Sequence, residues 1–304
     1  MTRPAQSMTH LDVRVGVNPI LWSNDDFRDL GGDLPLERCL GEMRAAGYAG
    51  TELGHKYPRD KAALGEMLDA HGLALVSGWH STYVLERPLE VEREALVAHL
   101  DLLGALGCRT AIVAECSRRS YDDPGAALQF ERNGDGLSSD EWDRLARGLD
   151  DLACIASERN MRLAYHHHMG TVVQTEPEIG ALMARTRKLH LLLDTGHLAF
   201  AGVDPVRVLG AHRARVAHVH LKNVRPEVVR QAWAERWSFA RAVRAGVFTV
   251  PGDGGMDFAP VFELLRGADY AGWLVVEAEQ DPKIAPPLEY ARRGRDYVRH
   301  ATGL

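Results

Sequence analysis

Short apolar segments alternate with helical patterns along the whole chain. Eight segments rich in Val, Leu, Ile and Ala, each bounded by polar or glycine-containing stretches, predict β-strands. They lie at residues 13–18, 50–54, 73–80, 110–115, 162–166, 190–194, 216–222 and 273–279. Between them, apolar residues recur at the spacing of amphipathic helices. This regular alternation predicts an α/β protein.

The predicted helices begin and end at recognisable signals. The clearest three end close to a glycine, which favours the left-handed conformation that follows a helix. They cover residues 36–46, 59–70 and 89–106. Ser138 with Glu141, and Thr175 with Glu178, have the spacing of a capping box, which satisfies free N–H groups at a helix start. These signals place helices between the predicted strands.

Eight strand-then-helix units fit a closed parallel barrel better than an open sheet. We therefore predict a single (β/α)₈ TIM barrel over residues 1–304, with residues 1–12 as a flexible N-terminal extension. No GxGxxG motif follows the first strand, so a dinucleotide-binding fold loses its main support. Two long loop insertions, 116–139 and 224–258, follow predicted strand ends, and we expect them to form walls or a lid of the site.

Composition narrows the partners of the protein. The chain has 304 residues, 45% of them hydrophobic, with a formal net charge of −6 and a pI near 6.2. This acidic balance disfavours binding to nucleic acid. The chain shows no signal-peptide pattern and no apolar run of membrane-spanning length, so we expect a cytoplasmic protein without a membrane partner. The four cysteines have no CxxC spacing, which argues against a disulfide framework or a thiolate zinc site.

Four of the predicted strands end in groups that a buried strand does not normally carry. The segments are RLAYHHHMG (162–170), HLLLDTGH (190–197), VAHVHLKN (216–223) and WLVVEAEQD (273–281). Histidines and carboxylates at the end of an apolar run are costly to bury unless the strand ends line a site. Together the four segments predict one metal-centred pocket.

Alternation along a strand decides which of these side chains share a face. The pairs and triplets that point together are His166 with His168, His218 with His220 and Lys222, and Glu277 with Glu279. His167 points to the opposite face. Imidazole and carboxylate ligands suit Mn²⁺, Co²⁺, Fe²⁺ or Zn²⁺. Asp194 and His197 belong to the same group, although Asp194 also fits a simple helix cap.

Polar and aromatic residues at these and other strand ends suit a polyhydroxylated ring, which needs hydrogen bonds at its edge and apolar contact on its face. The predicted substrate-binding residues are Asn18, Trp22, Glu52, Trp79 and His218. For Glu52, a bond to the backbone or to a neighbouring strand is an equal alternative. For Trp22 and Trp79, the alternative is core packing.

Six segments together resemble one family. They are GVNPILWSNDDFRDLGGDLPLERCL (16–40), ELGHKYPRD (52–60), YHHHMGT (165–171), LDTGH (193–197), HVHLKN (218–223) and EAEQDP (277–282). Over residues 14–292 the chain resembles the inosose dehydratases, also called 2-keto-myo-inositol dehydratases, of the xylose-isomerase-like barrel superfamily. DTGH and HVHLK recur across that superfamily, while the opening segment and YHHHMGT narrow the match.

The resemblance implies a lyase of myo-inositol catabolism that dehydrates scyllo-inosose, a polyhydroxylated cyclic ketone, to a trihydroxycyclohexane-1,2-dione. It implies Mn²⁺ or Co²⁺ as cofactor, with Zn²⁺ or Fe²⁺ as alternatives. Many members bind the ion through a Glu, Asp, His, Glu quartet, which falls here on His166, Asp194, His220 and Glu277. Because a histidine replaces the first glutamate, His167 or His168 stays an alternative to His166. Glu279 stays an alternative to Glu277.

Dehydrating a hydroxyketone needs a base at the acidic C–H, an acid at the departing hydroxyl and a Lewis acid that stabilises the enediolate. Histidine serves either proton task near neutral pH. We expect His168 and His197 to carry this proton transfer, with His80 and Glu115 in reserve. Lys222 is expected to stabilise oxyanion charge, unless it is a solvated surface lysine.

Three other activities stay open at this point. An inosose isomerase or ketose 3-epimerase of the same superfamily would form the same enediolate but reprotonate it. Abasic-site DNA endonucleases of the superfamily need several metals and a basic groove, which the net charge of −6 counts against. A non-catalytic sugar-binding barrel would keep the pocket without activity. The oligomeric state also stays open, a homo-oligomer included.

Overall fold

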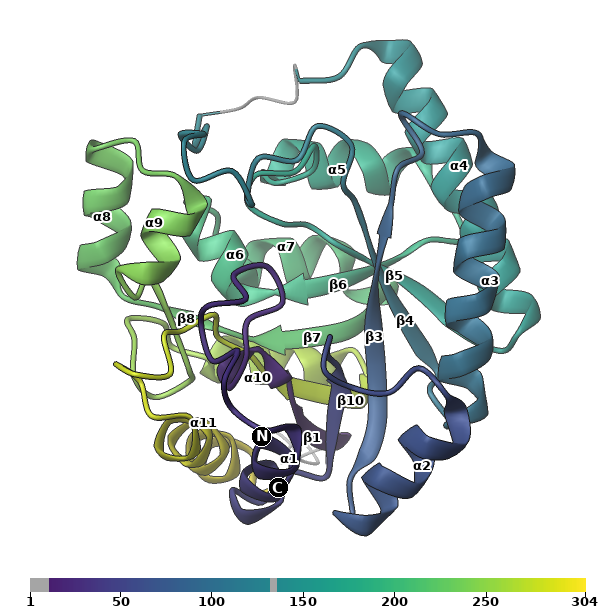
Figure 1. Cartoon of the computed structure of the whole chain (residues 1–304). Coiled ribbons are helices and arrows are strands. Elements are labelled where there is room, and N and C mark those ends of the chain that lie inside the picture. Colours follow the sequence, from purple (N-terminus) through teal and green to yellow (C-terminus); the bar gives the residue numbers. More distant parts are fainter. Residues whose placement is uncertain (1–10, 132–135) are drawn as a thin grey trace, which may run out of the picture.

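Eight parallel strands close into a barrel (Figure 1). The computed structural model describes residues 11–131 and 136–304. The barrel strands are β1 (Asp12–Val17), β2 (Gly50–Leu53), β3 (Ala74–Thr82), β4 (Thr110–Glu115), β5 (Arg162–His166), β6 (His190–Asp194), β7 (Val216–Leu221) and β10 (Ala271–Val276). Because β1 pairs with both β2 and β10, the sheet has no free edge. The predicted (β/α)₈ barrel is confirmed for the described part of the chain.

Four barrel strands end earlier than predicted, and two of these differences affect the site. β7 ends at Leu221 and β10 ends at Val276. Lys222, Glu277 and Glu279 therefore lie directly beyond the strands, on the carboxyl-terminal face of the barrel. This is the face where barrel enzymes assemble their active sites from strand ends and loops.

Helices cover the outside of the barrel (Figure 1). They are α1 (Leu36–Ala45), α2 (Lys61–Ala70), α3 (Leu89–Ala105), α4 (Ser139–Glu158), α5 (Glu176–Arg185), α6 (Thr195–Phe200), α7 (Pro205–His212), α10 (Ala259–Gly267) and α11 (Pro287–Thr302). The predicted capping residues act as expected at α4, where Ser138 Oγ accepts the Glu141 N–H at 3.3 Å and Glu141 accepts the Ser138 N–H at 2.9 Å. At α5, Glu178 accepts the N–H of Thr175 at 2.9 Å.

The apolar core has two parts. The larger part fills the space between the strands and the helices. The smaller part contains Ile112, Ala164, Leu192 and Ala217 from four adjacent strands, with Trp79 packed against it. Since Ile112 and Trp79 also line the pocket described below, this small cluster forms an apolar floor inside the barrel. Polar groups at the strand ends stand above this floor.

The two predicted insertions meet each other over one side of the barrel mouth. The second contains α8 (Pro226–Ala234), α9 (Phe239–Arg244) and β9 (Phe248–Thr249), which pairs with β8 (Asn223–Val224). The N–H of Leu128 in the first insertion donates to the carbonyl of Trp237 at 2.9 Å. Phe130 stacks on Trp233, with 4.7 Å between ring centroids. These contacts tie the insertions into one structure.

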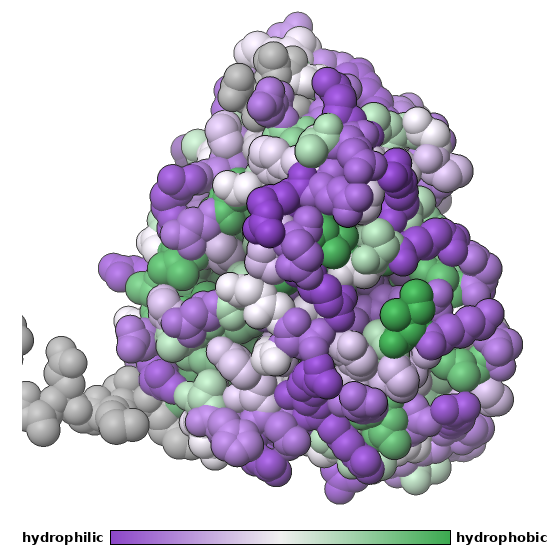
Figure 2. All heavy atoms as spheres, turned by 90° about the vertical axis from the view of Figure 1, so that its left-hand side faces the viewer, coloured by the Kyte–Doolittle hydropathy of each residue, from purple (hydrophilic) through white to green (hydrophobic). Residues whose placement is uncertain are grey.

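The N-terminal extension predicted over residues 1–12 lies mostly outside the described residues. Leu11 is buried and Asp12 begins β1, so these two residues already belong to the barrel. The molecular face that carries α8 and α9 is mostly hydrophilic, with apolar residues in small separate spots (Figure 2). Among the described residues, no helix is both long and apolar enough to cross a membrane.

Candidate active site

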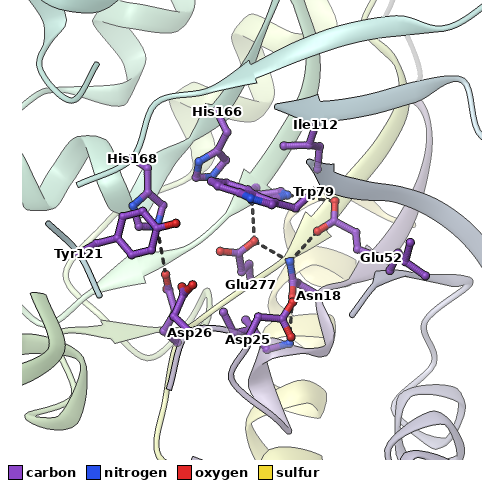
Figure 3. Close-up of a pocket in the computed structure, with 14 residues that line it drawn as sticks. Asn18, Asp25, Asp26, Glu52, Trp79, Ile112, Tyr121, His166, His168 and Glu277 are labelled. Carbon is purple, nitrogen blue, oxygen red and sulfur yellow. Dashed lines mark hydrogen bonds and ion pairs between the residues drawn. The ribbon is translucent and has the colours of Figure 1, made fainter. Parts of the chain in front are cut away.

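A pocket opens at the carboxyl ends of the barrel strands (Figure 3). Its lining residues come from loops and strand ends on all sides of the barrel: Asn18, Ile20, Asp25, Asp26, Glu52, Leu53, Trp79, Ile112, Tyr121, His166, His168, His220, Glu277 and Glu279. Most of them are polar, although Trp79 and Ile112 give the pocket an apolar wall. The predicted convergence of strand-end histidines and carboxylates on one place is therefore present.

The four predicted metal ligands lie together. His166 Nε2 is 3.2 Å from Asp194 Oδ2, and His220 Nδ1 is 3.5 Å from the same oxygen. His220 Nδ1 is also 2.6 Å from Glu277 Oε2. Metal–ligand bonds of about 2.0–2.2 Å place neighbouring ligands of one ion about 3 Å apart. These distances bring the four side chains into one buried cluster, from which an ion could be bound.

The donor chemistry also fits a divalent cation. His220 Nδ1 is buried without a well-aligned hydrogen bond, although it lies 2.6 Å from a carboxylate oxygen. Among the described residues, three buried carboxylates share the buried ammonium of Lys222: Asp194, Glu277 and Glu279. A fourth buried carboxylate, Glu52, lies against His218 and His220. A buried excess of negative charge is costly without a cation. The site is therefore suited to hold a doubly charged ion.

Asp194 has two tasks. Its Oδ1 accepts the N–H of His197 at 2.9 Å and so caps α6, while its Oδ2 faces the ligand cluster. The backbone N–H of Asp194 donates to Nε2 of His167 at 3.3 Å. His167 does not line the pocket, in agreement with its predicted opposite face. The helix-cap interpretation of Asp194 is thus confirmed, and its other oxygen lies among the predicted metal ligands.

Glu52 accepts a hydrogen bond from Nε2 of His220, the ring nitrogen on the side away from Glu277. Its Oε1 accepts hydrogen bonds from His218 Nε2 at 2.7 Å, His220 Nε2 at 3.1 Å and Ser77 Oγ at 2.9 Å. Burial raises the pKa of Glu52, but the two histidines outweigh it and hold the pKa well below its usual range. Since Nε2 of His220 is occupied, Nδ1 is the nitrogen left for a ligand, an arrangement that is general for metal-binding histidines.

Asn18 connects Glu52 to Glu277. Its Nδ2 donates to Glu52 Oε2 at 2.6 Å and to Glu277 Oε2 at 3.0 Å, and its Oδ1 accepts the N–H of Ile20. Both N–H groups of the amide are thus taken by protein carboxylates. Asn18 lines the pocket as predicted, but its bonds go to the carboxylates that surround the site.

Lys222 is fully buried beside the cluster. Its Nζ lies 2.6 Å from Glu277 Oε1, 2.8 Å from Glu279 Oε2 and 3.2 Å from Asp194 Oδ2. Burial lowers the pKa of Lys222, but these carboxylates raise it above its ordinary value. The stem passes over Gly196, where a Cβ would lie 2.4 Å from Lys222 Cγ. The lysine can follow this path only because residue 196, in the DTGH motif, is a glycine. Since Lys222 is fully buried, it is not a solvated surface lysine.

His168, His197 and Glu279 form a second group next to the quartet. Nε2 of His168 is 4.0 Å and Nε2 of His197 is 3.5 Å from Glu279 Oε1. The two imidazole rings are 3.9 Å apart between centroids. Burial lowers the pKa of both histidines well below the usual value. His168 lines the pocket, whereas His197 lies behind it.

Trp79 lies where a ring-shaped substrate would find an apolar face. Its indole packs edge-on against His166 at 5.3 Å and His168 at 5.9 Å between centroids. Trp22, by contrast, does not reach the pocket. It is fully buried, and its Nε1 donates to Glu42 of α1 at 2.7 Å, so the core-packing alternative describes it.

His80 and Glu115 also lie away from the pocket. His80 follows Trp79 in β3 and therefore points outward, where its ring packs on His99 of α3. Glu115 has the opposite parity to Ile112 in β4, and it accepts hydrogen bonds from one hydroxyl and three backbone N–H groups. The structure thus gives neither residue the reserve role in proton transfer that was expected.

Six residues that line the pocket were not predicted, and three of them carry polar groups: Asp25, Asp26 and Tyr121. Asp25 and Asp26 lie in the segment after β1, and Asp25 Oδ1 is 2.5 Å from His55 Nδ1. Tyr121 comes from the first insertion, and its ring packs 4.8 Å from that of His168. Two adjacent aspartates shortly after a predicted strand could have indicated that Asp25 and Asp26 line the site. Nothing in the local sequence distinguishes Tyr121.

Comparisons with known proteins agree with this geometry. The family model described as xylose isomerase-like TIM barrel matches residues 23–301. An inosose dehydratase of Geobacillus thermodenitrificans is 47% identical, over 96% of this chain and 98% of that protein. An inosose dehydratase of Clostridium botulinum is 43% identical, over 96% and 98%. A rhizopine catabolism protein, MocC, of Rhizobium meliloti is 48% identical, over 94% and 87%.

Solved structures of low sequence identity share the fold. The structure of an L-ribulose 3-epimerase matches with a TM-score of 0.66 and 18% identity, over 96% of this chain and 95% of that one. A probable 3-DHS dehydratase, AsbF, of Bacillus anthracis matches with a TM-score of 0.67 and 14% identity, over 94% and 98%. Taken with the sequence matches over nearly the full length, these findings show that the chain belongs to the inosose dehydratase family of xylose isomerase-like TIM barrels.

Proposed function

We propose that this protein dehydrates scyllo-inosose to a trihydroxycyclohexane-1,2-dione in myo-inositol catabolism, and that it does so in the cytoplasm on a free small molecule. The observation that carries the proposal is the buried quartet of His166, Asp194, His220 and Glu277 beside a histidine that faces the same pocket. Relatives named inosose dehydratase, 42–47% identical over most of the chain, support the choice of substrate.

The quartet is the proposed site of a divalent ion. Its imidazole and carboxylate ligands suit Mn²⁺, Co²⁺, Fe²⁺ or Zn²⁺, and the family resemblance favours Mn²⁺ or Co²⁺ among them. Such an ion supplies Lewis-acid stabilisation to negative charge on substrate oxygens. Glu277 is preferred to Glu279 because its Oε2 is 2.6 Å from His220 Nδ1, whereas Glu279 lies with His168 and His197. His166 is preferred to its two neighbours because its Nε2 faces Asp194.

The other pocket residues suit a polyhydroxylated ring. Trp79 and Ile112 offer an apolar wall to a ring face, and Asp25 and Asp26 offer hydrogen-bond acceptors to ring hydroxyls. Burial keeps His168 neutral, as a general base must be before it takes up a proton. Proton removal beside the carbonyl and loss of the neighbouring hydroxyl together release one water.

The direct test is incubation of the protein with scyllo-inosose and Mn²⁺, with the ultraviolet absorbance of the diketone followed over time. We expect absorbance to rise with wild-type protein and to stay flat with Asp194→Asn. Circular dichroism of the variant checks that it is folded. Appearance of an isomeric inosose by NMR, without diketone, would replace the proposal with an isomerase or epimerase. Nicking of abasic DNA under the same conditions would replace it with an endonuclease.

A further inference from the structure

The backbone of Met169 lies between two imidazoles of the site. Nδ1 of His168 is 2.8 Å from the carbonyl oxygen of Met169. The backbone N–H of Met169 donates to Nδ1 of His197 at 3.4 Å. All three residues are buried, so water does not compete freely for these bonds. One residue of the main chain therefore contacts the same ring position of both histidines, once as acceptor and once as donor.

These two contacts fix opposite tautomers. A carbonyl oxygen only accepts, so Nδ1 of His168 carries a proton and Nε2 of the neutral ring has a free lone pair. A backbone N–H only donates, so Nδ1 of His197 is bare and Nε2 of the neutral ring carries the proton. Which nitrogen holds the proton is set by the partner of the other nitrogen.

Both Nε2 atoms lie near Glu279 Oε1, at 4.0 Å for His168 and 3.5 Å for His197, but only His168 lines the pocket. Nε2 of His168, a lone-pair acceptor, belongs to a residue that lines the pocket. Nε2 of His197 lies 3.5 Å from Glu279 Oε1, without an aligned hydrogen bond, and the residue does not line the pocket. The other oxygen of Glu279 is 2.8 Å from Lys222 Nζ. Glu279 thus lies between the imidazole of His197 and the ammonium of Lys222.

We propose that Met169 assigns His168 and His197 different roles. His168 is the base whose Nε2 accepts the proton beside the substrate carbonyl. His197 is a positioning residue that orients Glu279, and it neither binds metal nor transfers a proton to substrate. The base role rests on the proposed dehydratase function, whereas the tautomers do not depend on it.

The proposed step balances in atoms and charge. The C–H bond beside the carbonyl breaks, an N–H bond forms on His168 Nε2, and the electron pair stays with the substrate. That pair forms the new double bond as the neighbouring C–O bond breaks. The departing hydroxide takes up one proton, water leaves, and His168 returns to its neutral state. No oxidant or reductant is needed.

The contacts of His197 also bear on whether His197 or His220 is the fourth metal ligand. His166, Asp194, His197 and Glu277 offer ligand atoms that all lie within 4.8 Å of one another, whereas His220 meets this criterion with Glu52 and His218. Because Nδ1 of His197 accepts the Met169 N–H, an ion could bind this ring only at Nε2, after that nitrogen loses its proton. The Nε2 of His220 bonds to Glu52, and its Nδ1 lies 2.6 Å from Glu277 Oε2. These contacts favour His220 as the fourth ligand.

The test combines NMR with a set of variants. Nitrogen-15 spectra of the metal-free full-length protein, labelled at histidine, report the tautomer of each ring, and His168→Gln and His197→Gln assign the signals. We expect a protonated Nδ1 in His168 and a protonated Nε2 in His197. The same tautomer in both rings would overturn the assignment, whatever reaction the protein catalyses.

Kinetics test the roles. His168→Gln should lower kcat by about 100- to 10,000-fold with little change in KM, the usual contribution of a general base. His197→Gln keeps an N–H donor for Glu279 and should lower kcat by about tenfold or less, whereas His197→Ala should lower it about 10- to 100-fold. Equal losses in His197→Gln and His168→Gln would overturn the division of roles. Wild-type protein that makes no diketone would overturn the proposed function and the base role together.

Discussion

Two polar strand ends of the same barrel show what separates a structural carboxylate from one available for chemistry. Glu115, at the end of β4, points away from the pocket, and its oxygens are taken by one hydroxyl and three backbone N–H groups. Asp194, at the end of β6, points into the cluster, and its Oδ2 meets two imidazoles and an ammonium. Both residues are fully buried.

The difference lies in what each partner can do. Backbone N–H groups are fixed donors, so the lone pairs of Glu115 are used up by the fold. Imidazoles and an ammonium can rearrange around a cation or a substrate, so the lone pairs of Asp194 can be used for binding. The partner of a buried carboxylate therefore predicts its role better than its burial or its place at a strand end.

We expect the largest effect, on metal affinity, from a change at Asp194, which points into the cluster. Asp194→Asn removes the oxygen that three cationic or ligating groups share, and should lower affinity for Mn²⁺ by at least about 100-fold. Metal content after dialysis, measured by mass spectrometry, checks this. Glu115→Gln is the matched control and should keep its metal. Equal metal loss in the two variants would erase the distinction between the two strand ends.

The path of Lys222 offers a second test, because its ammonium lies beside Asp194 in the same cluster. Gly196→Ala places a methyl group 2.4 Å from Lys222 Cγ, so the ammonium must move away from its carboxylates. A displacement of this kind costs about 100-fold in kcat or less, and the crowding about 1–3 kcal/mol of unfolding free energy. Steady-state kinetics and urea unfolding measure both.

A glycine elsewhere serves as the control for that substitution. Gly180 lies inside α5, and a Cβ there meets no atom within 4 Å. Gly180→Ala should leave kcat alone and stabilise the protein by roughly 0.5–1 kcal/mol, because alanine loses less backbone entropy in a helix. If Gly196→Ala behaved like Gly180→Ala, Lys222 would not need its observed path.

For Glu115, which points away from the pocket, we expect a change to affect stability alone. Glu115→Gln puts an NH₂ group against fixed backbone donors, which should cost about 1–3 kcal/mol of unfolding free energy. Urea unfolding measures the loss, and kcat of the folded variant should stay close to wild type. A kcat that fell while the unfolding free energy held would return Glu115 to the catalytic machinery.

The smallest effect concerns His80, which also points away from the pocket. Burial, and after it the nearby His99, lowers the pKa of His80 from 6.5 to about 4. In the unfolded chain, His80 therefore takes up a proton as pH falls through 6.5. In the folded protein, His80 takes up a proton only near pH 4. Stability should fall over this window as pH falls, by about 1–2 kcal/mol for a partly exposed ring.

Substitution isolates that contribution. His80→Gln should show a shallower loss of unfolding free energy between pH 6.5 and pH 4 than wild type, with the diketone assay unchanged near neutral pH. Denaturant unfolding at several pH values provides the comparison. Superimposable pH profiles would show that His80 titrates normally in the folded protein.

The sequence predicted the barrel well because each strand and helix carries its own local signal. Alternation of apolar segments located every barrel strand, and the capping box of Ser138 placed the start of α4 correctly. The ends of β7 and β10 were harder, because the polar residues that follow them continue the extended pattern of the strand.

For the site, strand parity worked where it was applied. It separated His167 from its neighbours, and it would also have turned His80 away from the pocket, since Trp79 precedes it and faces inward. Trp22 was misplaced because the turn after β1 carries it into the core against α1. Tyr121 was missed because an insertion loop reaches the pocket only through tertiary packing.

The central claim is that His166, Asp194, His220 and Glu277 hold one divalent ion. Crystals of the protein grown with MnCl₂, with diffraction recorded at the manganese absorption edge, locate the ion by its anomalous scattering. We predict one peak, about 2.0–2.3 Å from His166 Nε2, Asp194 Oδ2, His220 Nδ1 and Glu277 Oε2. A peak between His168, His197 and Glu279, or between Glu52 and His218, would contradict it.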